Sequence, residues 1–425
     1  MRGRGNTNVN GSIENLPLLI LLIGATVVAA IFLRGVCRRI GVPALVGYML
    51  LGVAVRFLDV NGNLLSGEVI AVYEFLGGIG VITLLFRVGI EADARDMLGQ
   101  FRRAAWVWLG NVAASGLAGF ATAYYLLGIS LIPSLFAGVA LTATSLGICL
   151  GVWREAGRLH TPSGALLTDV AELDDVSGVV LMILLVSIAP ILVLGNGDVL
   201  GAFAQAGLGV FIKVIGFAAV CIAFAYYLER PITAFFERLE PSPNPMIPIA
   251  GMALVIAAVA GWLGFSLAVG ALFAGMIFSR EKAAAQVDEA FSPLYDFFSP
   301  FFFVSIGLLF EPTLLVAGLA IGVPLLVAGI LGKIVGTVLP ALSMTSLMGG
   351  LVLGASMVPR AEIALVIAFE GRRLGDWAMP PELFSAIVVV SLVTSLVTPV
   401  IVARLLTVWT PRLKGETSSG QPPQS

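Results

Sequence analysis

Four acidic side chains lie within one long apolar stretch, where they can bind a cation or a proton. Asp169, Glu172, Asp174 and Asp175 all fall between Ala165 and Leu194. Each carboxylate at the centre of a bilayer costs about 3 kcal/mol on insertion scales, so four of them oppose insertion by on the order of 10 kcal/mol. A simple membrane anchor would not carry that cost.

The two adjacent acids are expected near the middle of the membrane. In a helix that begins near Gly164, Asp174 lies about 15 Å along the axis of a hydrocarbon core about 30 Å thick. Asp174 and Asp175 point about 100° apart, so they face different neighbours and differ in proton affinity. Asp169 and Glu172 extend the acids toward the cytoplasmic end. Asp169 and Glu172 either line a water-filled funnel that opens to the cytoplasm or lie near the lipid headgroups at the helix entry.

The composition determines the class of protein. The 425 residues are 58% hydrophobic and only 12% charged, which indicates an all-α polytopic membrane protein. Thirteen membrane spans are predicted from the apolar runs, at residues 16–33, 42–57, 69–90, 104–127, 133–153, 164–194, 203–228, 246–261, 264–279, 294–310, 314–341, 346–370 and 383–408.

The distribution of positive charge predicts the orientation. Arg34, Arg38 and Arg39 follow the first apolar run directly, which favours a retained helix with its N-terminus outside over a cleaved signal peptide. Alternation from that start places sixteen Lys and Arg residues in the cytoplasm and five outside. This bias predicts a cytoplasmic C-terminus in the cell membrane. Residues 409–425, rich in Ser, Gln and Pro, are expected to form a disordered cytoplasmic tail.

Two triplets of spans run in opposite senses and share a feature. The middle member of each triplet, residues 133–153 and 346–370, is interrupted by polar residues, with LTATSLG at 141–147 and SMVPRAE at 356–362. Interrupted spans at matching places in inverted repeats point to a transporter site. Thus the sequence predicts two broken helices at the centre of one membrane domain.

Several polar side chains in these spans are candidates for the site. The oxygens of Thr142, Thr144 and Ser145 can bind a hard cation or satisfy a helix break, although ordinary small-residue packing is an equally simple interpretation. Pro359 removes a helix hydrogen bond. Arg360 and Glu362 follow it, and each needs a partner elsewhere or a local unwinding.

A lysine in the eleventh predicted span completes the candidates. Lys333 is placed to pair with an acid of span 164–194, since an unpaired buried ammonium is costly. Gly332 and Lys333 are followed by Ile334, so they do not form a nucleotide-binding loop. We therefore expect no enzyme activity, no cofactor, no ATP and no nucleic-acid partner.

These segments together resemble the monovalent cation:proton antiporters of the NhaA-type fold, on the branch shared by sodium/proton antiporters and potassium-efflux proteins. The resemblance covers residues 17–408. It rests on IGVPALVGYMLLGV (40–53), LLFRVGIE (84–91), ALTATSLGI (140–148), ELDDVSG (172–178), FSPLYDFFSPFFFVSIGL (291–308), LGKIVG (331–336) and MVPRAEIALV (357–366).

The resemblance implies roles for individual residues. Asp175 looks like the carboxylate that alternately holds a proton and the transported Na⁺, and Asp174 like its neighbour, paired with Lys333 until it is protonated. Two acids and a lysine resemble the electrogenic subgroup. Potassium-efflux relatives often carry an amide at the first acid, so Asp174 favours sodium. Arg87 departs from the family pattern, where an apolar residue is usual.

The resemblance also implies an architecture. Residues 1–408 would form one transporter domain with two crossed, broken helices. A core bundle (104–194 and 314–408) would move against a homodimerising bundle (16–90 and 246–310), joined by a linker helix at 203–228. The expected activity is electrogenic Na⁺ or Li⁺ exchange for protons, in pH homeostasis or salt tolerance. The alternatives are K⁺/H⁺ antiport and sodium-coupled symport of an organic anion.

Overall fold

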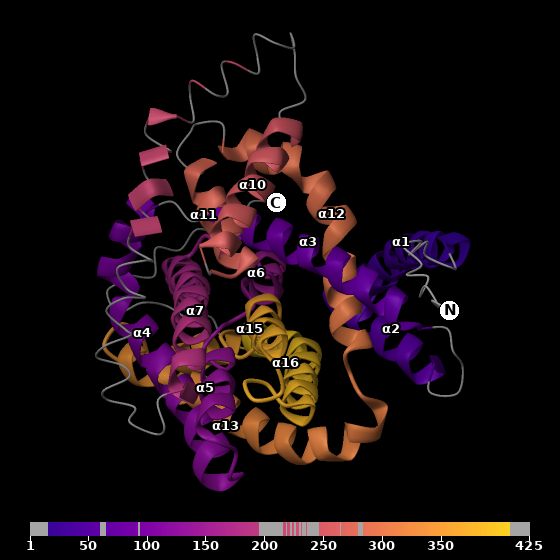
Figure 1. Cartoon of the computed structure of the whole chain (residues 1–425). Coiled ribbons are helices and arrows are strands. Elements are labelled where there is room, and N and C mark those ends of the chain that lie inside the picture. Colours follow the sequence, from indigo (N-terminus) through magenta and orange to yellow (C-terminus); the bar gives the residue numbers. More distant parts are fainter. Residues whose placement is uncertain are drawn as a thin grey trace, which may run out of the picture.

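The computed structural model describes residues 16–59, 65–91, 94–194, 246–263, 265–278 and 284–408, with scattered residues between 216 and 235. These segments form a bundle of helices (Figure 1). The helices of the first half are α1 (Leu16–Arg39), α2 (Ala44–Asp59), α3 (Gly67–Glu91), α4 (Ala94–Ala121, continued by a π-helical turn, Thr122–Leu126), α5 (Leu131–Ala140), α6 (Leu146–Glu155) and α7 (Pro162–Leu194). The second half contains α10 (Met246–Trp262), α11 (Leu267–Phe278), α12 (Ala284–Leu308), α13 (Leu315–Ala341, after a 3₁₀ turn at Pro312–Leu314), α14 (Leu347–Ser356), α15 (Glu362–Leu374) and α16 (Pro381–Val408).

The all-helical membrane fold that the sequence predicts is confirmed. Seven of the described helices are long and apolar enough to cross a membrane alone, while α5, α10, α11 and α14 are shorter apolar helices. Each of the predicted spans 133–153 and 346–370 consists of two short helices separated by non-helical residues. The predicted linker at 203–228 and the tail at 409–425 lie largely or wholly outside the described residues.

Three helix ends differ clearly from the prediction. Helix α12 begins at Ala284 and α4 at Ala94, each ten residues before the predicted starts at residues 294 and 104, and α1 continues to Arg39 rather than ending at residue 33. In each case the helix extends from the apolar run into polar sequence. Backbone hydrogen bonding continues beyond the hydrocarbon boundary, because a helical backbone is satisfied in water as well as in lipid.

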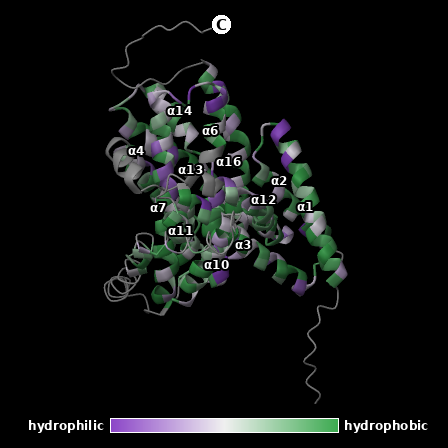
Figure 2. Ribbon diagram, turned by 90° about the horizontal axis from the view of Figure 1, so that it is seen from above, coloured by the Kyte–Doolittle hydropathy of each residue, from purple (hydrophilic) through white to green (hydrophobic). Residues whose placement is uncertain are grey.

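The helices pack in two groups. Helices α4 to α7 pack with α13 to α16, and α1 to α3 pack with α10 to α12. Hydrophobic residues follow almost the whole length of the ribbons, and hydrophilic residues gather at helix ends and near the centre of the bundle (Figure 2). This pattern is expected of helices whose outer faces contact lipid.

Several of the described helix pairs approach so closely that a β-carbon in place of a glycine hydrogen would clash at the contact. A β-carbon on Gly52 would lie 2.2 Å from the Val304 oxygen and 2.9 Å from the Gly307 α-carbon, and one on Gly275 would lie 2.0 Å from the Phe86 oxygen and 2.8 Å from the Gly89 α-carbon. The two contacts, α2 with α12 and α11 with α3, are therefore geometrically equivalent.

The third contact follows the same symmetry. Helices α4 and α13 meet at Gly110 and Gly336, where a β-carbon on either residue would lie within 2.6 Å of the other's carbonyl oxygen. The pseudo-symmetry between the two halves of the chain, which relates α2 to α11 and α3 to α12, also relates α4 to α13. The inverted repeat predicted for the two triplets of spans thus extends over two further helices in each half.

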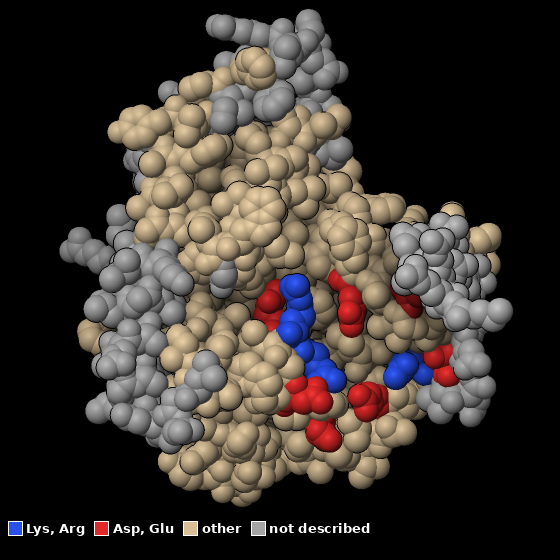
Figure 3. All heavy atoms as spheres, viewed as in Figure 1, with Lys and Arg blue, Asp and Glu red and all other residues tan. Residues whose placement is uncertain are grey.

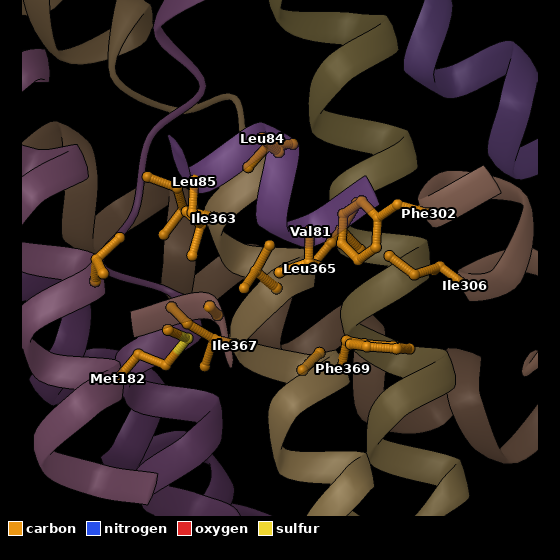
Figure 4. Packing of buried hydrophobic residues seen from close by; sticks show 14 of the residues in the cluster. Val81, Leu84, Leu85, Met182, Phe302, Ile306, Ile363, Leu365, Ile367 and Phe369 are labelled. Atoms are coloured by element: carbon orange, nitrogen blue, oxygen red, sulfur yellow. The ribbon is translucent and has the colours of Figure 1, made fainter. Parts of the chain in front are cut away.

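Helix α15 joins the two groups through apolar contacts (Figure 4). Leu85 of α3 lies against Ile363 at the start of α15. Near the other end, the ring of Phe369 meets that of Phe302 of α12 edge to face, with centroids 5.7 Å apart. Leu85 and Phe302 have no exposed surface. These contacts therefore join α15 to the second group at two positions, Ile363 and Phe369.

Candidate functional site

The two helix breaks lie against each other. The chain is not helical between α5 and α6, nor between α14 and α15. The backbone N–H of Ser145 donates to the carbonyl of Pro359 at 2.8 Å, and the Thr144 hydroxyl donates to the carbonyl of Met357 at 3.2 Å. The predicted crossing of two broken helices is thus present in the structure. Each break supplies hydrogen bonds that the other lacks.

Two buried cations satisfy the exposed carbonyls at the end of α5. Arg360 donates from Nη1 to the carbonyls of Leu141 and Ala143, the latter at 3.2 Å, and from Nη2 to the carbonyl of Gly329 of α13 at 3.0 Å. Lys333 donates to the carbonyl of Thr142. The C-terminal end of a helix carries a partial negative charge, so these cations stabilise it electrostatically as well as by hydrogen bonding.

A carboxylate lies at the N-terminal ends of α6 and α15, where the helix dipole is positive. Glu362 is the first residue of α15, and its Oε2 accepts a hydrogen bond from the hydroxyl of Ser145 at 2.8 Å. Ser145 is itself the N-cap of α6. One carboxylate therefore neutralises the N-terminal ends of both half-helices. Arg360 and Glu362 have separate partners, as their spacing and the predicted unwinding imply.

Asp174 forms the most deeply buried ion pair of the described residues. Its Oδ2 lies 2.6 Å from Nζ of Lys333, and neither side chain has exposed surface. The same oxygen accepts hydrogen bonds from the Thr144 hydroxyl at 2.7 Å and from Nδ2 of Asn111 at 2.7 Å. Helices α4, α7 and α13 and the break after α5 all contribute to this cluster. The predicted pairing of the two spans is present.

The other acids of α7 differ from Asp174 in exposure. Asp169 is buried, and Glu172 and Asp175 are half-buried. Asp175 follows Asp174 directly and therefore borders the ion pair from a different face of α7. The helix thus presents one fully buried and one half-buried acid next to each other, and Oδ1 of Asp175 is itself a buried atom.

The hydroxyl groups predicted to bind a cation already hold internal hydrogen bonds. Thr142 donates to the carbonyl of Val139 at 2.8 Å, and the hydroxyls of Thr144 and Ser145 donate to carboxylates. Their oxygens retain lone pairs for a cation. In this arrangement, however, they stabilise the break itself.

The face shown in Figure 3 has a hollow bordered by charged side chains of both signs. The C-terminal end of α15, which lies beside this hollow in the same view, carries two ion pairs. Arg372 pairs with Asp376, and Arg373 lies 3.5 Å from the buried Glu370. Charged side chains therefore lie both at the crossing of the two broken helices and near the C-terminal end of α15.

Comparison with known proteins identifies this arrangement. A family model described as "Sodium/hydrogen exchanger, transmembrane" matches residues 24–408. The chain belongs to the sodium/hydrogen exchanger family. It is 28% identical over 348 residues to the high-affinity Na⁺/H⁺ antiporter NhaS3 of Synechocystis, covering 79% of this chain and 71% of that protein. It is 27% identical over 368 residues to the Na⁺/H⁺-K⁺ antiporter GerN of Bacillus cereus, covering 85% of this chain and 89% of that protein.

A solved structure shows the same fold. The sodium proton antiporter MjNhaP1 of Methanocaldococcus jannaschii superposes with a TM-score of 0.67 at 16% identity, covering 93% of this chain and 99% of that one. The resemblance predicted from the sequence is therefore confirmed at the level of family and fold. The exchanger is a multi-pass membrane transporter of monovalent cations and protons, and not an enzyme.

The sequence analysis missed one polar residue of the exchanger's buried cluster. Asn111 of α4 has no exposed surface and donates to Asp174. Its own Oδ1 accepts a hydrogen bond from the Thr337 hydroxyl at 3.3 Å. The signal in the sequence was an amide within the apolar run WVWLGNVAASG. A buried polar group in a membrane span usually faces a polar partner.

Proposed function

We propose that this exchanger moves Na⁺ or Li⁺ out of the cytoplasm in exchange for protons, and that the exchange is electrogenic. The observation that carries the proposal is the buried Asp174–Lys333 pair at the crossing of two broken helices, directly beside the half-buried Asp175. A cation and a proton compete for Asp175, with oxygens of residues 142–145 assisting the cation.

Lys333 explains why the proposed exchange carries net charge across the membrane. With Lys333 bound, Asp174 is ionised and the pair is neutral. When Asp174 takes a proton, the lysine is released, so one proton in addition to that on Asp175 takes part in the cycle. Two protons exchanged for one monovalent cation move one net charge, which couples transport to the membrane potential.

We further propose that the group of helices that holds the site moves against the other. Helices α4 to α7 and α13 to α16 would form the moving core, and α1 to α3 with α10 to α12 a scaffold that dimerises. Residues 203–228 would link the two. With the N-terminus outside the cell, α15 runs outward from the crossing. The contacts of Leu85 with Ile363 and of Phe302 with Phe369 then close the external side.

The test is proton flux in proteoliposomes with a preset pH gradient, on addition of NaCl, LiCl, KCl or choline chloride. Collapse of the gradient with Na⁺ and Li⁺, but not with K⁺ or choline, supports the proposal. Asp175→Asn should abolish the response while leaving the protein folded, because an amide cannot exchange a proton for a cation. Undiminished exchange by that variant would refute the assignment of Asp175.

A potassium/proton antiporter is the second candidate. The GerN relative, whose name includes both Na⁺ and K⁺, favours keeping it. A response to KCl alone in the same vesicles would establish it. A sodium-coupled symporter would give no proton flux with any of the four salts.

A further inference from the structure

Arg87 of α3 lies at the boundary between the two groups of helices. Its guanidinium carbon is 5.1 Å from the centre of the Tyr295 ring of α12, within the range of a cation–π interaction. Both side chains are half-buried. Tyr295 is also hydrogen-bonded to the side chain of Ser299, one turn further along α12. The ring is therefore fixed on α12 and holds the positive charge of Arg87 against its face.

Glu362 brings the charge of the crossing to the same ring. The Glu362 carboxylate and the Arg87 guanidinium both interact electrostatically with the phenol of Tyr295. Glu362 is half-buried, and its Oε2 accepts the hydrogen bond from Ser145. Ser145 is one of the residues proposed to assist the cation. A set of interactions thus leads from the proposed cation site through Glu362 and Tyr295 to Arg87.

The position of Arg87 along α3 places it close to the crossing. Leu85, two residues earlier, lies against Ile363, the residue that follows Glu362. At a rise of about 1.5 Å per residue, Arg87 lies about 3 Å further along the axis of α3. In the proposed orientation α3 runs toward the cytoplasm, so Arg87 is on the cytoplasmic side of the contact that closes the external side. The guanidinium therefore lies at the inner end of the cytoplasmic approach to the cation site.

The carboxylates of the site by themselves favour divalent cations over monovalent ones. Asp175 and Glu362 are half-buried, and carboxylate oxygens are the ligands that Ca²⁺ and Mg²⁺ prefer. Lys333 and Arg360 are buried, and they already bond to a carboxylate and to backbone carbonyls. Arg87 adds a half-buried positive charge on the opposite side, from the second group of helices. Its removal makes the approach to the site one charge unit more negative, whatever else the guanidinium contacts.

We propose that Arg87 is a specificity-determining residue that disfavours divalent cations at the cation site. The electrostatic energy between two charges is proportional to each charge, so a fixed positive charge repels Ca²⁺ twice as strongly as Na⁺. The factor by which Arg87 lowers the affinity for Ca²⁺ is therefore the square of the factor for Na⁺. The inference rests on the proposed function, because it places the cation at Asp175. It gives an electrostatic reason for the exchange of monovalent cations.

The experiment compares Arg87→Gln with Arg87→Lys, which keeps the charge, and with Arg404→Gln, which removes an exposed charge near the end of α16. Na⁺-driven proton flux is measured in proteoliposomes at alkaline pH, where few protons compete with the cation, and Ca²⁺ is added as a competing ion. We expect the KM for Na⁺ to fall about threefold in Arg87→Gln and the inhibition constant of Ca²⁺ to fall about tenfold. Both constants should stay at the wild-type values in Arg87→Lys and Arg404→Gln.

Two outcomes would overturn the proposal. One is an Arg87→Gln protein whose Na⁺ and Ca²⁺ constants change by the same factor or not at all, because a merely structural effect does not depend on the charge of the ion. The other is an Arg87→Lys protein that behaves like Arg87→Gln. Arg87→Met has a similar length and no charge, and it gives the same comparison if the glutamine variant does not fold. A wild-type protein without any cation-dependent flux would instead refute the proposed function.

Discussion

Replacement of Lys333 by methionine tests whether the buried ion pair determines stability. Methionine has a similar length but no charge, so Asp174 keeps only Asn111 and Thr144 as partners. Both members of the pair have no exposed surface and lie 2.6 Å apart. Removing one partner of such a pair typically costs about 3–5 kcal/mol, because the other charge is left uncompensated.

Thermal unfolding in detergent, followed by tryptophan fluorescence, measures this effect. Lys333→Met should melt several degrees below the wild type. The double variant Asp174→Asn with Lys333→Met removes both charges of the pair and should be close to the wild type. A deficit that the double variant does not reduce would show that the pair is not the cause.

Two further predictions concern the crossing and the helix contacts. Arg360→Gln should lower the unfolding free energy by at least about 3 kcal/mol in chemical denaturation, because it removes charged donors to buried carbonyls. The control, the exposed Arg404→Gln, should change the unfolding free energy by less than about 0.5 kcal/mol. Equal effects of the two substitutions would contradict the role of Arg360 in capping α5. Gly336→Ala should lower the melting temperature, because its β-carbon would lie 2.4 Å from the carbonyl oxygen of Gly110, whereas Gly251→Ala meets nothing within 4 Å. Equal melting of these two glycine variants would show that α4 and α13 can separate without cost.

Local sequence features were sufficient to predict much of the fold. The two helix breaks follow from polar residues and Pro359 within apolar runs. The pairing of Lys333 with an acid of span 164–194 was predicted because a buried ammonium needs an acid, and the resemblance to the cation:proton antiporters implied that this acid is Asp174. Each of these inferences depends on a strong cost, which the bilayer imposes on any unsatisfied polar group.

The remaining details depend on which side chains meet in three dimensions. The sequence does not reveal that Arg360 caps backbone carbonyls, because every residue has a carbonyl and only the folded chain shows which ones are exposed. Asn111 was missed because a single amide among apolar residues of α4 gives no indication of its distant partner. The extension of α12 to Ala284 was missed because hydropathy reports the membrane boundary rather than the helix end.

The pairing of Asp174 with Lys333 also has a consequence for the synthesis of the protein. The two residues are 159 positions apart in the chain, which corresponds to roughly 10–30 s of translation. During that interval α7 has left the ribosome while the helix that carries its counter-charge has not yet been made. A nascent chain that ends before α13 should therefore keep α7 near the insertion machinery or carry Asp174 protonated. Lateral release of the first half into the bilayer would await the arrival of the second.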